Sequence, residues 1–123
     1  MKTGIYTDKA PKPAGPYSPG IVSGTGVFTA GQGPKDPATG KIPEGIEAQT
    51  RQVMRNLKSI VEEAGASFDN VVKSTVHLAN LDDFAAFNAV YSEFLTPPYP
   101  VRTTVGSALL GGILVEIDFI AEI

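Results

Sequence analysis

The spacing of hydrophobic and polar residues changes along the chain, and each spacing predicts one kind of element. From Ile46 to Ala64 apolar residues recur at helical intervals, with charged residues largely on the opposite side. Gly65 follows and is typical of a residue that ends a helix. This segment therefore predicts a helix that packs on the core. Its apolar stripe consists of Ile46, Val53, Met54, Leu57, Ile60, Val61 and Ala64.

A second helix is predicted over residues 84–94, and the proline-rich segment 96–100 ends it. Asp82 and Asp83 favour its N-terminus through capping and the helix dipole. Asn88 lies beside the apolar stripe, so its amide either forms a structural bridge or lines a pocket. The sequence leaves both interpretations open. The stripe consists of Phe84, Phe87, Tyr91 and Phe94.

The remaining β-branched or alternating segments predict strands separated by turns rich in glycine and proline. The order of elements is a strand, a hairpin, a helix, a strand, a helix and two final strands. This order predicts an α+β fold in which a mixed, mostly antiparallel sheet carries two helices on one face. The predicted strands are residues 1–6, 21–22, 27–30, 71–78, 101–105 and 114–121, with a hairpin turn at 24–26.

Alternation in the strand over residues 71–78 places His77 on the more polar face of the sheet. An imidazole with a pKa near 6.5 would suit a general base, but a lone histidine on a strand is better explained as an ordinary sheet residue. Val71, Lys73 and Thr75 share the face of His77. The opposite face consists of Val72, Ser74, Val76 and Leu78.

Alternation in the last strand places Glu116 and Asp118 together, opposite the apolar face of Val115, Ile117 and Phe119. Two carboxylates two residues apart on one strand face are separated by about 7 Å, which invites comparison with glycosidases. The chain offers no aromatic platform for a sugar beside them. A polar sheet face is therefore the better interpretation.

Two loops contain residues suited to a binding site. Prolines stiffen the first loop, over residues 10–20, which displays Tyr17 and Ser18. Gly31 and Gly33 follow the strand 27–30 and allow a ligand to approach the backbone closely. No helix follows these glycines directly, so they do not predict a phosphate-binding loop.

Composition and charge exclude several classes of function. The net charge of −3 and the lack of a lysine or arginine cluster argue against a nucleic-acid interface. The chain has no cysteine, which excludes disulfides, thiol nucleophiles and zinc bound by thiolates. His77 is the only histidine and no acidic ladder of the calcium-loop type occurs, so we predict no metal site.

The length of 123 residues predicts one domain over residues 1–123, large enough for a genuine core. No apolar run is long enough to predict a transmembrane helix. The first residues lack the apolar segment of a signal peptide, so we expect a cytoplasmic protein.

Arg102 stands at the start of a β-branched strand, directly after a proline-rich turn. Its guanidinium offers a planar fork of donors that fits a carboxylate and stays charged at any working pH. A rigid turn before the strand would hold such a clamp still. The competing interpretation is a surface arginine at a strand edge.

Seven stretches, in the right order along the chain, resemble the RidA (YjgF) family of reactive-intermediate deaminases. The resemblance implies a chorismate-mutase-like α+β fold and a homotrimer with an active site in each cleft between neighbouring subunits. It also implies hydrolysis of 2-imino acids, arising from 2-aminoacrylate-type enamines, to 2-keto acids and ammonia, with no cofactor or metal. The stretches are Gly15-Pro16-Tyr17-Ser18, Ala30-Gly31-Gln32, Asp36-Pro37-Ala38-Thr39-Gly40, Gln49-Thr50-Arg51-Gln52, Phe84-Ala85-Ala86-Phe87-Asn88, Pro100-Val101-Arg102-Thr103-Thr104-Val105 and Val115-Glu116-Ile117.

The resemblance also implies roles for the residues that match the family's motifs. Arg102 would clamp the substrate carboxylate, assisted by the backbone around Thr104. Tyr17 would close over the ligand, and Glu116 would activate or orient the attacking water. An iminium carbon is already electrophilic, so this chemistry needs a positioned water but no protein nucleophile.

Further matching positions concern binding. Gly31 would contact the reacting nitrogen or water through its backbone, and Phe87 and Asn88 would lie at the edge of the cleft. Ala30 stands where active family members usually have serine, which removes one possible hydrogen bond to substrate or water. The turn over residues 110–112 is also shorter than the family's usual turn before Glu116.

Two alternatives compete with the deaminase. Because of Ala30, the chain could be a module that binds carboxylate ligands or proteins without catalysis. An endoribonuclease or translation inhibitor is the third hypothesis. The net charge of −3, the single histidine and the lack of a basic patch argue against it.

Overall fold

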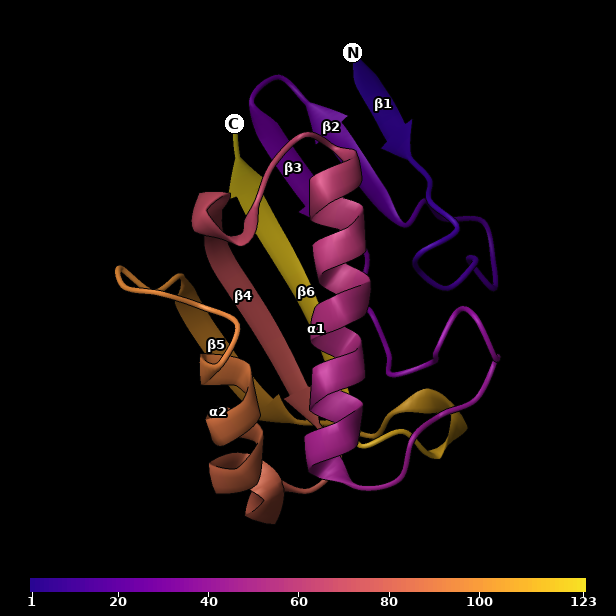
Figure 1. The fold of residues 1–123 in the computed structure, drawn as a ribbon, viewed down its shortest axis with the longest axis vertical. Helices are drawn as coiled ribbons and strands as arrows, with labels where there is room; N and C mark the ends of the chain where they lie inside the picture. Colours follow the sequence, from indigo (N-terminus) through magenta and orange to yellow (C-terminus); the bar gives the residue numbers. More distant parts are fainter.

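A computed structural model describes all residues 1–123 and contains one six-stranded sheet with both long helices on the same face (Figure 1). The strand order is β1-β2-β3-β6-β4-β5, and only β4 and β5 are parallel. The predicted α+β fold with a mixed, mostly antiparallel sheet is confirmed. The elements are β1 (Lys2–Ile5), β2 (Gly20–Ser23), β3 (Gly26–Thr29), α1 (Ile46–Glu63), β4 (Val71–Leu78), α2 (Phe84–Ser92), β5 (Val101–Gly106) and β6 (Val115–Glu122).

Helix α1 follows its predicted amphipathic pattern and supplies much of the core. The predicted stripe residues Val53, Met54, Leu57, Ile60 and Val61 are fully buried. The helix ends at Glu63, its C-cap is Ala64, and Gly65 follows with a φ of 85°. The N–H groups of Gly65 and Ala66 donate to the carbonyls of Glu62 and Val61, which is the paired arrangement of a Schellman motif.

The predicted alternation of β4 is wrong at its first two residues. Val71 is buried and Val72 is 48 % exposed, the reverse of the expected assignment. A register shift against β6 between Val71 and Lys73 explains the difference, because an extra residue at such an irregularity moves the side chains before it to the other face. From Ser74 onward the predicted faces are confirmed: Ser74, Val76 and Leu78 are buried.

Helix α2 begins at Phe84, as predicted, but it ends earlier than predicted. A short 3₁₀ turn, Leu81–Asp83, precedes it, and Asn80 caps that turn by accepting a hydrogen bond from the N–H of Asp82 at 2.9 Å. Asp82 and Asp83 lie inside that 3₁₀ turn, and Asp83 occupies the N-cap position of α2 without a capping hydrogen bond from its side chain. The helix stops at Ser92, two residues before the predicted end.

The sheet has one face covered by the helices and one that no helix covers. Register and alternation place Arg102 and Thr104 on the helix-covered face, beside Ser74 and Val76. We call the other side the open face. It consists of Phe28 of β3, Glu116, Asp118 and Ile120 of β6, Lys73, Thr75 and His77 of β4, and Val101, Thr103 and Val105 of β5.

Neither helix is both long and apolar enough to cross a lipid bilayer, as the sequence predicted.

Candidate active site

The side chain of Arg102, on β5, extends toward α2, and its guanidinium lies over three aromatic rings of that helix. The distances from Cζ to the ring centroids are 5.0 Å for Tyr91, 5.5 Å for Phe87 and 5.6 Å for Phe84. These rings belong to the predicted apolar stripe, which therefore both packs the core and holds a cation in place. Contacts of this kind are favourable because the ring face attracts positive charge.

The charge of Arg102 has no carboxylate partner in the chain. The one ion pair joins Arg51 and Glu93, at 2.9 Å on the surface. Arg102 instead borders a small, mostly apolar pocket of about 270 Å³. An unpaired, half-buried guanidinium beside an apolar pocket suits a small organic anion. The pocket is lined by Asn88, Tyr91, Ser92, Tyr99, Pro100 and Arg102.

Phe87 and Asn88, predicted at the edge of a cleft, are placed differently from each other. Asn88 lines the pocket. Phe87 is fully buried in the core, so it supports the guanidinium from below and offers no surface to a ligand. The sequence left open whether Asn88 bridges elements or lines a pocket. Its side chain forms no hydrogen bond to another element, so the pocket-lining role is favoured.

Glu116, Gly31 and Ala30 form a second group, at the junction of β3 and β6. A Cβ atom on Gly31 would lie 2.6 Å from Glu116 Oε2, so only glycine lets the carboxylate rest over this backbone. Gln32 fixes the junction by exchanging two backbone hydrogen bonds with Ile117, at 2.8 and 3.2 Å. Ala30 donates its N–H to the carbonyl of Pro19 at 2.8 Å and thereby ties the proline-rich loop to this group.

The open face around Glu116 holds further polar groups. Burial raises the pKa of Asp118 above its usual value, and the electrostatic interaction with His77, a hydrogen bond from Thr75 and the charge of Lys73 oppose that rise. His77 Nδ1 lies 2.7 Å from Ser107 Oγ. No cluster of three or more potential metal ligands occurs. The predicted shared face of Glu116 and Asp118 is confirmed by their pairing with His77 and Thr75.

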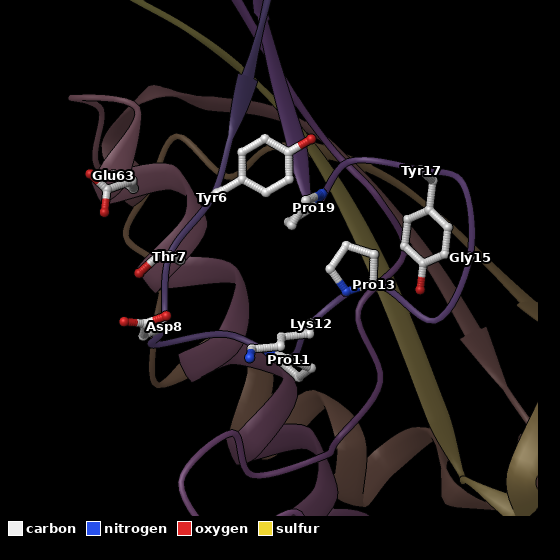
Figure 2. Close-up of a pocket in the computed structure, with 10 residues that line it drawn as sticks. All are labelled: Tyr6, Thr7, Asp8, Pro11, Lys12, Pro13, Gly15, Tyr17, Pro19 and Glu63. Atoms are coloured by element: carbon white, nitrogen blue, oxygen red, sulfur yellow. The ribbon is translucent and has the colours of Figure 1, made fainter.

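Tyr17 lies on the proline-rich loop, which lines the largest pocket, of about 670 Å³ (Figure 2). That pocket contains none of the other predicted site residues, so its size does not mark the chemistry. The Tyr17 hydroxyl accepts a hydrogen bond from the N–H of Ala14 at 3.1 Å. To close over a ligand, as the sequence implied, this hydroxyl would have to leave its own loop.

The shortened turn before β6 adopts a compact conformation. Leu110–Gly112 forms a tight turn in which Gly111 and Gly112 leave the helical region, with φ values of 72° and 70°. These left-handed conformations favour glycine. After this turn, Glu116 lies in regular register opposite His77.

Within one chain the predicted site residues form two groups that do not meet. Arg102 and Thr104, with Asn88 above them, lie on the helix-covered face, whereas Glu116 with Gly31 lies on the open face. Strand β4 also separates β5 from β6. A single copy therefore cannot present Arg102 and Glu116 to the same small ligand.

The whole chain is similar to known proteins. A sequence model of the family described as Endoribonuclease L-PSP matches residues 7–123. A RutC family protein of Pyrococcus abyssi is 51 % identical over 119 residues, covering 95 % of this chain and 94 % of that protein. A 2-iminobutanoate/2-iminopropanoate deaminase of Salmonella typhimurium is 42 % identical over 125 residues, covering 98 % of both chains.

The fold has the same relatives. The crystal structure of RidA from the Antarctic bacterium Psychrobacter sp. superposes with a TM-score of 0.96 at 44 % sequence identity. The match covers 98 % of this chain and 99 % of the other.

Proposed function

The chain belongs to the RidA family, whose sequence model is described as Endoribonuclease L-PSP, and from this premise we propose that it hydrolyses 2-imino acids to 2-keto acids and ammonia. The substrates are the reactive imines that arise from 2-aminoacrylate-type enamines. We further propose that the protein acts in the cytoplasm and needs no cofactor.

Arg102 is the observation that carries this proposal. It combines a fixed guanidinium, the absence of an acidic partner and a small apolar pocket. A 2-imino acid matches these properties, because it has a carboxylate for the fork and a short carbon chain for the pocket. A 2-keto acid has the same carboxylate and should therefore bind as the product.

The reaction needs little beyond position and proton transfer. Glu116 accepts a proton from a water molecule as the water oxygen bonds to the imine carbon, which forms a carbinolamine. When the reaction starts from the protonated imine, Glu116 then returns this proton to the carbinolamine nitrogen. As the C–N bond breaks, Glu116 accepts the proton of the carbinolamine hydroxyl, so the carbonyl forms and ammonia leaves. Gly31 contributes its backbone to this step, while Arg102 and the backbone near Thr104 hold the carboxylate.

The separation of Arg102 from Glu116 leads us to propose that each site is completed by a second copy of the chain, in a homotrimer. The Arg102 group of one copy would meet the Glu116, Gly31 and Tyr17 group of the next. Apolar side chains that are exposed on the open face support this proposal, since Val101 is 67 % exposed and Phe28 42 %.

The test is keto-acid release from imines that an amino-acid oxidase generates in the same vessel. We expect the wild type to accelerate release, and Arg102→Ala to lower kcat/KM roughly 30- to 1,000-fold, as the loss of about 2–4 kcal/mol of charged hydrogen bonding implies. Arg55→Ala, which removes an exposed arginine of α1, is the matched control and should match the wild type. If the wild type releases keto acid no faster than the protein-free control with every imine tested, the proposed deaminase activity is refuted.

Measurements of 2-keto-acid binding and RNA cleavage, made beside the imine assay, separate the two alternatives. A module that binds without catalysis would take up 2-keto acids yet leave imine hydrolysis unchanged, and Ala30→Ser would then create activity. A ribonuclease would cleave RNA at a rate that stays constant through successive purification steps, and Arg102→Ala would not alter its imine background.

A further inference from the structure

Two buried hydroxyl groups next to Arg102 have no hydrogen-bond partner in the protein. They are Oγ of Ser74 and the hydroxyl of Tyr91, in residues that are 0 % and 6 % exposed. Buried polar groups are nearly always paired, because an unpaired one destabilises the folded state. Two of them beside the one unpaired guanidinium of the site therefore suggest a function.

The geometry places these groups directly behind Arg102. Ser74 of β4 is the register partner of Arg102 on β5, so the two side chains are neighbours on the helix-covered face. Tyr91 has the nearest of the three rings below the guanidinium and also lines the pocket. Burial raises the pKa of Tyr91, and the Ser74 hydroxyl and the Arg102 charge oppose that rise.

A guanidinium has five N–H donors in one plane, and a carboxylate gripped by the fork uses two of them. The remaining donors point away from the ligand and need acceptors. The aromatic rings of α2 cover the face of the guanidinium and accept no in-plane N–H. The hydroxyls of Tyr91 and Ser74 are the buried acceptors that the fold supplies without another partner.

We propose that Tyr91 and Ser74 are positioning residues that hold the Arg102 guanidinium in the orientation that binds a carboxylate. When the acid is bound, an N–H of Arg102 donates to the Tyr91 hydroxyl oxygen, and the Tyr91 hydroxyl donates to Ser74 Oγ. The inference rests on the proposed role of Arg102 as the carboxylate clamp. It adds that the two hydroxyls set the direction in which the fork points, beyond the support that the aromatic rings give.

The test measures the dissociation constant of pyruvate by isothermal titration calorimetry, together with the melting temperature of each protein. Ser74→Ala and Tyr91→Phe remove one hydroxyl each. Thr50→Val is the matched control, because Thr50 Oγ1 of α1 is the third buried hydroxyl without a partner and does not line the pocket. We expect Ser74→Ala and Tyr91→Phe to raise Kd about 3- to 10-fold, the range for one lost hydrogen bond, while Thr50→Val leaves Kd unchanged.

Melting temperature separates this role from a structural one. Removing an unpaired buried hydroxyl should leave the melting temperature unchanged or raise it, so weaker binding with unaltered stability supports the proposal. In an Arg102→Lys background Tyr91→Phe should have no further effect, because the planar fork that it orients is gone.

Two outcomes would overturn the inference in distinguishable ways. Wild-type affinity for pyruvate in both Ser74→Ala and Tyr91→Phe would refute the positioning role of these two residues but not the role of Arg102 as the carboxylate clamp. A wild-type protein that fails to bind pyruvate would refute the clamp itself, and the supporting role with it. Should Tyr91→Phe lower the melting temperature, Ser74→Ala alone decides, since it removes the smallest group.

Discussion

At the scale of single residues, the proposed chemistry depends on how closely side chains can approach the backbone. Glu116 rests over Gly31 because glycine leaves the space that any Cβ would fill. The pair is held from both sides, by the Gln32–Ile117 hydrogen bonds and by the bond between Ala30 and Pro19. The position of the carboxylate is thus determined by a residue with no side chain.

This relation predicts the effect of Gly31→Ala. The added methyl group would lie 2.6 Å from Glu116 Oε2 and must displace the carboxylate. We expect kcat for imine hydrolysis to fall about 10- to 100-fold, as for a catalytic group displaced by roughly 1 Å, while pyruvate binding at Arg102 is retained.

The double variant supplies the control. Because the methyl group acts by moving Glu116, Gly31→Ala should cost nothing further in a Glu116→Ala background. A Gly31→Ala protein with wild-type kcat, or fully additive losses in the double variant, would contradict the link between the two residues.

At the scale of elements, α1 carries a buried polar face that the hydrophobic pattern did not predict. Asn56 donates to the carbonyls of Gly33 and Lys35, at 3.0 and 2.9 Å. Gln49 donates to the carbonyl of Pro43 and accepts from the N–H of Leu114, at 3.0 and 2.8 Å. The side-chain amides of Asn56 and Gln49 thus form hydrogen bonds with backbone groups of the loops on either side of the site, in place of backbone partners.

The elements themselves were predictable because each follows a local rule. Periodicity gave α1, and β-branched runs gave β4 and β6 with the faces of Glu116 and Asp118. Local rules could not predict the irregularity at Val72, which depends on pairing with a neighbouring strand. They also could not predict that Asn80 caps the Leu81–Asp83 turn before α2, because several nearby residues can serve as caps. Local rules also could not predict that the hydroxyls of Ser74 and Tyr91 lie beside Arg102, because the pairing of β4 with β5 brings these residues together.

The buried amides lead to a prediction about stability. Asn56→Ala leaves two loop carbonyls unpaired in the interior, so we expect the free energy of unfolding to fall by about 2–4 kcal/mol. Chemical denaturation monitored by circular dichroism measures this. Ser59→Ala, on the same helix, should change it by less than about 0.5 kcal/mol. Equal effects of the two substitutions would mean that the loop bonds of Asn56 contribute nothing.

At the scale of the whole molecule, the position of the proposed catalytic groups is the main constraint. Arg102 and Glu116 lie on opposite faces of one sheet with β4 between their strands. No rotation of a side chain brings them to one ligand. The open face, with Phe28, Val101 and Val105 exposed, offers an apolar surface on which a second copy would pack.

This arrangement predicts that two inactive variants restore each other. Arg102→Ala and Glu116→Gln chains are unfolded together in equal amounts and refolded, and imine hydrolysis is compared with that of each variant refolded alone. Random assembly of a trimer makes about three of every four trimers mixed, and a cyclic mixed trimer has one cleft in which both residues are native. The mixture should therefore regain about one quarter of wild-type activity, because roughly a third of the clefts in those trimers are complete.

The alternative arrangements give different results in the same experiment. A site built within one chain has no complete copy in any mixture, so activity would stay at the level of the separate variants. Light scattering on the wild type supplies the second check, with an expected mass of about three times the 12.9 kDa of one chain. A monomer at micromolar concentration that still hydrolyses imines would place Arg102 and Glu116 in separate roles and refute the shared site.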